Sequence, residues 1–318
     1  MTMIAYGPVP SRRLGRSLGI NDIPPKVCTY SCVYCQLGRT IKMAAERRRF
    51  YNPAEVAKSV RVKVKAARDS GEAIDYLTFV PDGEPTLDVN LGREIASLRP
   101  LGIDIAVISN SSLVSREEVR EALNEANWVS LKMDAVDEGV WRKVNRPHRS
   151  LQLEDILDGA LAFSRDFSGQ LTTETMLVEG LNDGDDRLRQ AADFVAQLDP
   201  ATAYLAIPTR PPAEPWVRPP DEEAVNRAYQ IFSDRIENVE YLIGYEGNSF
   251  ALTGDTREDL LSIAAVHPMR RDAVGESLAR AGAGWDVVSG LVEQGRLVET
   301  EYDDHQFFVR RIRRARGR

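Results

Sequence analysis

The chain has 318 residues, of which 43% are hydrophobic and 28% charged, and its formal net charge is −7. This length suits one large domain and a small one, and no apolar run approaches the length of a membrane span, which excludes an integral membrane protein. The charge is uneven: residues 1–50 hold nine Lys and Arg against two acids, and the last nine residues hold six arginines and no acid. This asymmetry indicates an anionic ligand near the N-terminal segment, whereas solvation alone explains the C-terminal arginines equally well.

The N-terminal segment contains Ser11-Arg12-Arg13-Leu14-Gly15-Arg16, which superficially resembles a twin-arginine export signal. An export signal needs an apolar stretch next, but Asn21-Asp22 and Pro24-Pro25-Lys26 follow instead. We therefore expect a cytoplasmic protein, with a first strand near Ser17 to Asn21.

The only three cysteines, Cys28, Cys32 and Cys35, have the spacing C-x3-C-x2-C. Three thiolates in one short loop can hold three irons of a cubane cluster and leave the fourth iron open to bind a second molecule. An open iron indicates chemistry rather than simple electron storage.

Two other uses of these cysteines fit less well. Structural zinc usually takes four protein ligands in two pairs, whereas this chain has no second pair and its histidines, His148, His267 and His305, lie far downstream. A disulfide framework prefers an even number of cysteines in a secreted protein, so an odd, clustered set indicates a reducing compartment.

Strands and helices alternate after the cysteine loop. Asn52, Pro53 and Gly71 predict a helix over 52–71. Further strands are expected at Ile74 to Val80, Ile103 to Ser109, Val129 to Ala135, Thr173 to Val178 and Ala203 to Pro208, and further helices near 88–99, 115–126, 151–165, 184–198 and 221–236. About six βα units predict an α/β fold, a partial (β/α)6 barrel with fewer units than the eight of a closed TIM barrel and a lateral opening for a large substrate.

We expect residues 1–252 to form this barrel and residues 253–318 to form a small second domain. Helices are predicted at 255–266, 270–281 and 285–294, then a β-hairpin over Arg296 to Ile312 with Asp303-Asp304 at its turn. This order is that of a winged helix, but the third helix has no Lys or Arg, which argues against base readout in a major groove. Phosphate contact, binding of a tRNA or protein substrate, and packing on the barrel stay open.

Asp82-Gly83-Glu84-Pro85 follows the second predicted strand, at the end where a barrel places its active site. Gly83 lets the backbone approach a ligand closely, and the carbonyls and Glu84 nearby can receive an amino group. Alone, Gly-Glu-Pro is a common turn, but about fifty residues after the cysteine motif it is far more specific.

The two motifs together resemble the radical S-adenosylmethionine (SAM) superfamily: Cys28, Cys32 and Cys35 with Tyr34 before the last cysteine, and Gly83-Glu84-Pro85. The resemblance covers roughly residues 1–250. It implies that the cysteines hold a [4Fe–4S] cluster whose open iron binds the amino and carboxylate groups of SAM. It also implies that one electron, from an external donor such as flavodoxin or ferredoxin, cleaves SAM to methionine and a 5′-deoxyadenosyl radical that abstracts hydrogen from a substrate.

Within the superfamily, residues 7–19 resemble a group of Fe–S oxidoreductases similar to the enzyme that builds the wyosine ring on tRNA. Phe79, residues 83–87, Ser109-Asn110, residues 132–134 and residues 179–182 also resemble this group. The wyosine enzymes have further cysteines for a second cluster, which this chain lacks.

Strand periodicity selects further site residues. Lys132 and Asp134 should share the inward face of their strand, where Lys132 meets the SAM carboxylate or an anionic substrate, forms a Schiff base if its pKa is lowered, or makes a structural ion pair. Glu174 is expected to contact the cofactor ribose or to pair with Lys132, and Asn110 is another ribose candidate. The predicted SAM site comprises Tyr34, Gly83, Glu84, Pro85, Asn110, Lys132, Asp134 and Glu174.

The substrate candidates are the arginines Arg12, Arg13, Arg16, Arg47 and Arg210. The first four, with Arg48 and Arg49, are expected to form an anion clamp at the open side of the barrel, or else salt bridges to acidic helices. Arg210 is expected to reach a carboxylate or phosphate from a proline-fixed loop, or to lie on the surface. RNA, above all tRNA, is the leading substrate; a peptide, protein or small metabolite comes second, and an Fe–S electron-transfer or sensor protein third.

Overall fold

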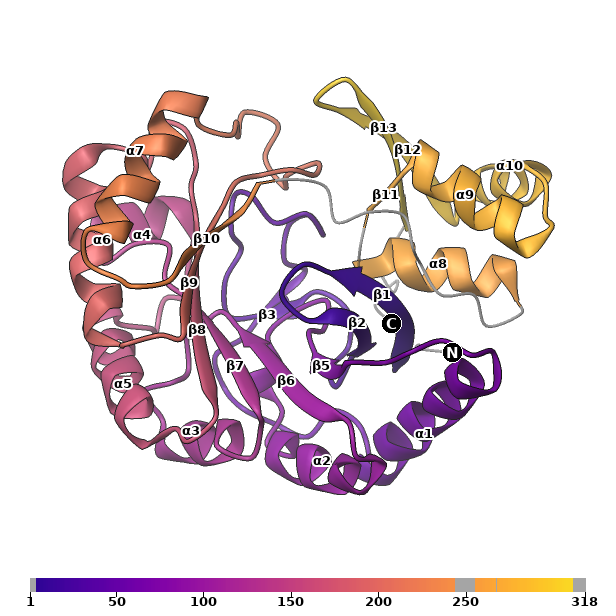
Figure 1. Cartoon of the computed structure of the whole chain (residues 1–318), viewed down its shortest axis with the longest axis horizontal. Helices are drawn as coiled ribbons and strands as arrows, with labels where there is room; N and C mark the ends of the chain where they lie inside the picture. The colour runs from indigo at the N-terminus through magenta and orange to yellow at the C-terminus, as the bar shows by residue number, and fades with distance from the viewer. Residues whose placement is uncertain (1–3, 244–254, 267, 311–318) are drawn as a thin grey trace.

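The computed structural model describes residues 4–243, 255–266 and 268–310. An eight-stranded sheet in the order β1-β2-β5-β6-β7-β8-β9-β10 curls around a central space (Figure 1). Strands β1 and β2 are antiparallel, and from β2 onwards all neighbours are parallel. The strands are β1 Ala5–Ser11, β2 Gly15–Ile20, β5 Tyr76–Phe79, β6 Asp104–Ser109, β7 Trp128–Lys132, β8 Gln170–Met176, β9 Thr202–Ala206 and β10 Val239–Leu242.

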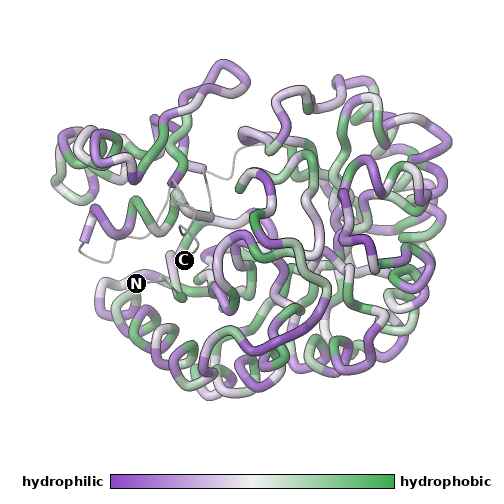
Figure 2. The backbone as a smooth tube through the Cα atoms, turned by 180° about the vertical axis from the view of Figure 1, so that it is seen from behind, coloured by the Kyte–Doolittle hydropathy of each residue, from purple (hydrophilic) through white to green (hydrophobic). Residues whose placement is uncertain are grey.

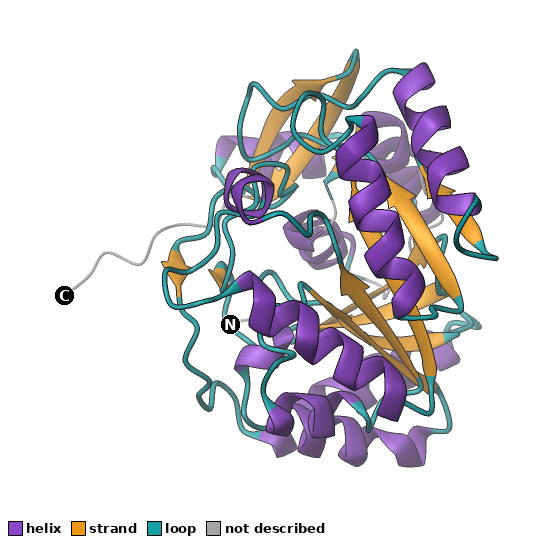
Figure 3. Ribbon diagram, turned by 90° about the vertical axis from the view of Figure 1, so that its left-hand side faces the viewer, coloured by secondary structure: helices purple, strands orange, loops and turns teal. Residues whose placement is uncertain are grey.

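Helices cover the outer face of this sheet, each burying one apolar side (Figure 3). They are α1 Pro53–Asp69, α2 Leu91–Leu98, α3 Glu117–Leu123, α4 Glu138–Val144, α5 Leu153–Asp166, α6 Asp185–Gln197 and α7 Glu222–Ser233. Along their tubes hydrophilic and hydrophobic stretches alternate, as amphipathic helices require (Figure 2). The predicted cap of α1 is confirmed, because the Asn52 side chain accepts a hydrogen bond from the Ala54 N–H at 3.0 Å.

The predicted partial barrel is confirmed, but the predicted number of strands was too low. The structure has seven parallel strands instead of six, because the short β10 was missed. It also has β1, whose Pro8 and Pro10 argue against a strand; prolines are tolerated there because β1 lies at an edge of the sheet. Helix α4, which has seven residues, was missed as well.

The tip of the β1–β2 hairpin fills part of the space inside the barrel. Leu14, next to the tip, is buried in a small hydrophobic core with Trp128, Tyr204 and Leu242 from β7, β9 and β10. The arginine before it, Arg13, points to the same interior. The hairpin therefore forms a floor beneath the carboxyl ends of the parallel strands.

The C-terminal residues form a separate hydrophobic core from three helices and a small antiparallel sheet in the order β11-β13-β12. Its elements are α8 Thr256–Val266, α9 Arg271–Ala281, α10 Asp286–Glu293, β11 Met269–Arg270, β12 Leu297–Tyr302 and β13 His305–Arg310. The predicted hairpin is confirmed, with Asp303 and Asp304 at its turn. The predicted boundary between residues 252 and 253 lies outside the described residues.

This C-terminal unit contacts the barrel at several places, among them an ion pair of Arg280 with Glu72 at 3.2 Å. Val9 of β1 packs against its core, and the Tyr302 hydroxyl donates a hydrogen bond to the Pro208 carbonyl at 3.0 Å. The hairpin thus touches the loop that follows β9. Among the described residues, no helix has both the length and the apolar character needed to span a membrane.

Candidate active site

The cysteine loop lies between β2 and α1 and contains two two-residue strands, β3 Val27–Cys28 and β4 Lys42–Met43. The residues at the C-terminal end of α4 hold it in place. The Ser31 N–H donates to the Asn145 carbonyl at 3.0 Å, and the Val33 N–H donates to the Val144 carbonyl at 2.9 Å. A helix that the sequence did not reveal therefore fixes the backbone of the loop.

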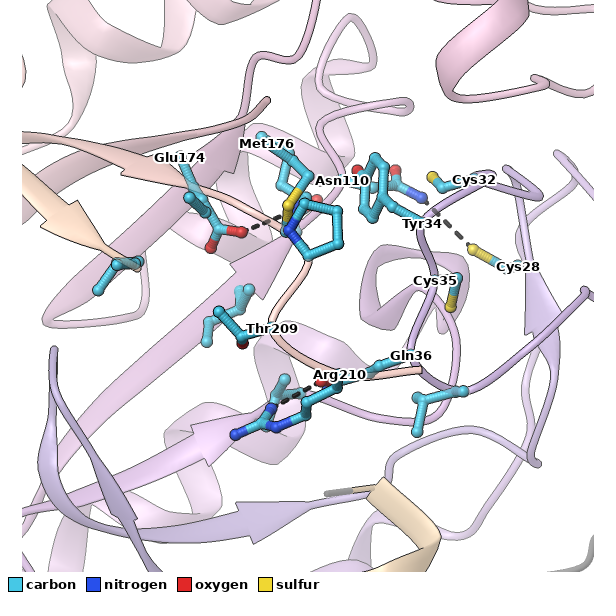
Figure 4. Close-up of a pocket in the computed structure, with 18 of the residues that line it drawn as sticks. Cys28, Cys32, Tyr34, Cys35, Gln36, Asn110, Glu174, Met176, Thr209 and Arg210 are labelled. Atoms are coloured by element: carbon cyan, nitrogen blue, oxygen red, sulfur yellow. Dashed lines mark hydrogen bonds and ion pairs between the residues drawn. The ribbon is translucent and has the colours of Figure 1, made fainter. Parts of the chain in front are cut away.

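A cavity of about 280 Å³ lies between the cysteine loop and the carboxyl ends of the parallel strands (Figure 4). This volume is near the lower end of the range for small-molecule sites, about 300–1,000 Å³. Figure 4 shows the three cysteines together on one side of the cavity, with Glu174 and Met176 opposite them. Twelve predicted site residues line the cavity: Cys28, Cys32, Tyr34, Cys35, Gly83, Glu84, Asn110, Lys132, Glu174, Arg12, Arg13 and Arg210.

Four predicted residues lie outside the lining. Pro85 begins a short 3-10 helix, Pro85–Leu87, and Asp134 is buried behind Tyr34. Arg16 is exposed and faces Glu72 at 3.6 Å. Arg47 lies outside the cavity lining; it donates to the carbonyls of Thr86 and Asp88, both at 2.9 Å, and so holds the backbone after Glu84. It also lies 3.9 Å from Glu118 of α3, which agrees with the expected salt bridge to an acidic helix.

The three thiols fit an iron–sulfur cluster. They form no disulfide, and burial is the main cause that raises the pKa of each of them, to about 12 for Cys32. Two amides face the sulfurs: Asn110 Nδ2 lies 3.5 Å from Cys28 Sγ, and Asn145 Nδ2 lies 3.6 Å from Cys32 Sγ. Within the described ranges, no three His, Cys, Asp or Glu side chains are grouped to hold one metal ion. A cubane fits because its cysteines bind different irons.

The Gly-Glu-Pro loop packs tightly against the cysteine loop. A Cβ atom at Gly83 would lie 2.0 Å from the Val27 carbonyl oxygen, so only glycine permits this approach. The Glu84 carboxylate is fully engaged within the protein, because it accepts hydrogen bonds from Thr86, Ser109 and the Asn110 N–H. Glu84 therefore holds the loops that form the wall of the cavity.

Glu174 is the centre of an ion network on the opposite wall. It accepts from Lys132 Nζ at 2.6 Å and from a guanidinium nitrogen of Arg13. Burial alone would raise the pKa of Glu174, but Lys132 and Arg13 lower it to about 2. The predicted pairing of Lys132 with Glu174 is confirmed.

The Schiff-base role suggested for Lys132 required a lowered pKa. Burial by itself lowers the pKa of this lysine, but the carboxylates of Glu174 and Asp134 outweigh burial and raise it. Lys132 therefore stays an ammonium group, with Nζ 5.0 Å from the centre of the Tyr34 ring. It can attract an anion but is a poor nucleophile.

A buried hydrogen-bond network joins the cysteine loop to Asp134, which follows β7. One member of this network, Asn145, was not identified from the sequence. Asp134 accepts from the Tyr34 hydroxyl, from Asn145 Nδ2 at 2.6 Å and from the Met176 N–H at 2.9 Å. The same Asn145 amide faces Cys32. No sequence signal identifies Asn145, because it becomes important only when the end of α4 packs on the loop.

We predict that Asn145→Leu lowers the reduction potential of the cluster. An N–H group facing a thiolate sulfur stabilises the more negative, reduced state. The expected decrease is about 30–60 mV, which for a one-electron couple is a three- to tenfold change in the equilibrium. An EPR-monitored redox titration of the reconstituted protein measures it.

Asn182→Ala is the matched control. Asn182 is also buried and donates to the Asp134 carbonyl at 2.8 Å, but none of its hydrogen bonds with the described residues involves a sulfur. The reduction potential of the cluster in Asn182→Ala should stay at the wild-type value. Equal potentials for wild type and Asn145→Leu would contradict the assignment.

Two buried acids, Asp22 and Glu94, lie apart from the cavity lining. Both carboxylate oxygens of Asp22 and both of Glu94 lack a hydrogen-bond donor among the described residues. Burial first, and Asp88 second, raise the pKa of Glu94 to about 8. The folded protein therefore keeps a proton that the unfolded chain releases at lower pH.

We expect Glu94→Gln to stabilise the protein. Between pH about 4.5 and 8 the unfolded state loses the Glu94 proton while the folded state retains it, so wild-type stability falls as pH rises through this window. The amide does not ionise, so its benefit should grow over this window to roughly 2–4 kcal/mol at pH 8. Urea unfolding of both proteins at pH 5 and pH 8 measures the difference. If Glu94→Gln is no more stable than wild type at pH 8, Glu94 is ionised in the folded protein without a cost in stability.

Comparisons with known proteins agree with this site. A family model described as the radical SAM superfamily matches residues 23–194, which include the three cysteines, Glu84, Lys132 and Glu174. The chain therefore belongs to the radical SAM superfamily. It is an enzyme of this class, and its cofactors are a [4Fe–4S] cluster and SAM.

One relative is similar over almost the whole length. A UPF0026 protein of Methanocaldococcus jannaschii is 45% identical over 312 residues, which cover 98% of this chain and 97% of the relative. Two solved structures share the fold. A radical SAM methyltransferase from Sphaerobacter thermophilus has 18% identity and a TM-score of 0.53, and covers 71% of this chain and 66% of its own. TYW1 with a lysine-pyruvate adduct bound has 15% identity and a TM-score of 0.51, and covers 70% of this chain and 74% of its own.

Proposed function

We propose that this enzyme abstracts hydrogen from an anionic substrate, and that this substrate is RNA, above all tRNA. The positive charge of the cavity carries the proposal. Four cationic side chains line it, Arg12, Arg13, Lys132 and Arg210, against two carboxylates, Glu84 and Glu174. The cations exceed the carboxylates by two charges, and Glu174 lies between two of the cations, Lys132 and Arg13.

The residues of this chain have separable tasks in that reaction. When bound, the cluster and SAM supply one-electron cleavage and hydrogen abstraction. Cys28, Cys32 and Cys35 would hold the cluster, and the wall formed by Gly83, Glu84 and Asn110 would hold SAM beside it. Lys132 and the arginines would attract the substrate anion and orient it.

Arg210 closes the cavity beside the cysteines. Its guanidinium donates to the Gln36 side chain at 2.6 Å, and Gln36 directly follows Cys35. Arg210 comes from the loop that Tyr302 touches at Pro208. A substrate bound on the C-terminal unit would thus lie next to a cationic residue of the cavity.

Two finer assignments belong to the same proposal. The order of three helices and a hairpin supports a winged-helix-like C-terminal unit that contacts phosphates rather than bases. The shared fold with TYW1 and the motifs at residues 7–19 and 83–87 support a place among the wyosine-type enzymes. With three cysteines in the whole chain, a second cluster of cysteine ligands is not available.

The test is anaerobic turnover of the reconstituted enzyme with dithionite and SAM. We expect a tRNA pool to raise the rate of 5′-deoxyadenosine formation at least tenfold over SAM alone. Deuterium from deuterated tRNA should appear in 5′-deoxyadenosine. The same pool digested to nucleotides is the control, and equal rates with and without intact tRNA would contradict the proposal.

A peptide or small metabolite is the second candidate. The modest cavity volume and the net charge of −7 favour it. If the substrate is a small anion, the digested pool or a metabolite extract should raise the rate of 5′-deoxyadenosine formation in the same assay, and intact tRNA should not.

A further inference from the structure

Residues 41–43, after the cysteine motif, run beside the cysteine loop and have exposed side chains. Strand β4 pairs with β3 so that Met43 stands opposite Cys28, and the Ala44 N–H donates to the Cys28 carbonyl at 3.0 Å. Anything bound on the outer side of Met43 therefore lies one strand away from a cluster ligand.

This outer side carries exposed apolar side chains. Ile41 is 51% exposed, Met43 38% and Val89 42%. Val89 lies beside the same segment, because its N–H donates to the Arg48 carbonyl at 3.1 Å. These three are among only seven large apolar residues that the described part of the chain exposes, so their exposure along one segment needs an explanation.

Exposed cations belong to the same segment. Within residues 41–50, Lys42, Arg48 and Arg49 are exposed, and Glu46 is the one exposed acid, while Glu118 of α3 lies 3.9 Å from Arg47. Lys42 and Arg49 make no ion pair with a described residue, whereas exposed arginines on the outer helices pair with acids, as Arg189 does with Asp185 at 3.1 Å. We call Ile41, Lys42, Met43, Arg48, Arg49 and Val89 the Met43 patch.

We propose that the Met43 patch docks an acidic one-electron carrier protein that reduces the cluster. An apolar centre within a charged rim is typical of transient protein interfaces, and the positive rim complements an acidic carrier. One electron passes from the carrier to the cluster; the carrier is oxidised by one electron, and no bond forms or breaks. This inference rests on the cluster alone and not on the identity of the substrate.

RNA is the competing occupant of a cationic surface. The three exposed apolar side chains favour a protein, because RNA contacts are dominated by phosphate and by stacking on aromatic rings. The patch has aliphatic and thioether groups at its centre and no exposed aromatic residue. The position behind Cys28, outside the substrate cavity, also suits electron entry.

The test compares a protein reductant with a small one. Stopped-flow absorbance follows the oxidation of a reduced acidic flavodoxin by the reconstituted enzyme at low salt. We expect the double variant Lys42→Glu, Arg49→Glu to reduce the second-order rate constant at least tenfold, because steering between opposite charges is lost. The rate constant with dithionite, which needs no docking, should stay within twofold of wild type.

The matched control is Arg189→Glu, Arg227→Glu, which changes the net charge equally on α6 and α7, at the outer side of the barrel (Figure 1). It should retain the wild-type rate with flavodoxin. A second readout needs no cluster: the Kd of oxidised flavodoxin for the apo-protein should rise at least tenfold in the patch variant only.

Three results would overturn the proposal. The first is an unchanged flavodoxin rate in the patch variant, and the second is an equal loss with flavodoxin and with dithionite. The third is loss of tRNA binding together with a wild-type flavodoxin rate, which would make the Met43 patch an RNA surface. The first two results do not bear on the tRNA stimulation assay, and the third would overturn only the docking proposal, so the two proposals can fail separately.

Discussion

Cys32→Ala is expected to abolish cluster binding and, with it, the cleavage of SAM. The three thiols lie at one side of the cavity, and each must supply a ligand if a cubane is to keep a single open iron. The reconstituted variant should contain less than about a tenth of the wild-type iron, and 5′-deoxyadenosine formation should fall at least about a thousandfold.

The fold of the apo-protein should survive this change. Cys32 is only partly buried, and Asn145 keeps its hydrogen bond to Asp134 at 2.6 Å when the sulfur is removed. We expect the Tm of the apo-variant to lie within about 2 °C of wild type, which corresponds to about 1 kcal/mol or less.

Ser31→Ala, in the same loop, is the matched control. Its hydroxyl accepts from the Thr40 N–H at 3.3 Å and its side chain is not part of the cavity lining. This variant should bind iron as wild type does. A Cys32→Ala protein that retains four irons and a wild-type EPR spectrum would contradict the assignment of Cys32 as a ligand.

The parts of this site that the sequence predicted are those with a local pattern. The cysteine spacing fixes three ligands within one loop, and the alternation along β7 and β8 puts Lys132 and Glu174 on the same face. Both predictions needed only the spacing of neighbouring residues and the period of a strand. The parallel order of the strands then brings their carboxyl ends together, which is why distant residues met as expected.

The parts that the sequence could not predict depend on packing between distant segments. Arg47 belongs to a run of three arginines that look alike in the sequence. In the structure Arg47 points inward to the Thr86 and Asp88 carbonyls, whereas Arg48 and Arg49 are exposed. Asn145 acts through the end of α4, the seven-residue helix that was missed. Even Asp134, expected on the inward side of its strand, lies beyond the end of β7; it is covered by Tyr34 and is not part of the cavity lining.

Glu174→Gln is expected to have the largest effect on stability. Its carboxylate neutralises Lys132 and Arg13 in the interior. The Glu174 side chain is 9% exposed, that of Lys132 17% and that of Arg13 15%. An amide of the same shape leaves two cations without a counter-charge, and breaking a buried ion pair in this way costs about 3–5 kcal/mol. Urea unfolding at pH 7 should show this loss, and the Tm should fall by roughly 6–15 °C.

The pH dependence separates this electrostatic loss from a packing defect. Because the pKa of Glu174 is lowered to about 2, its contribution is present above the unfolded pKa of about 4.5 and is lost as pH falls from there towards 2. The gap between wild type and Glu174→Gln should therefore narrow over this window. Glu94→Gln, the same substitution at a buried acid without nearby cations, should change stability in the opposite direction. A stability difference that stays constant from pH 7 to pH 3 would show that the charge of Glu174 does not stabilise the fold, and it would contradict the ion network assigned to Glu174, Lys132 and Arg13.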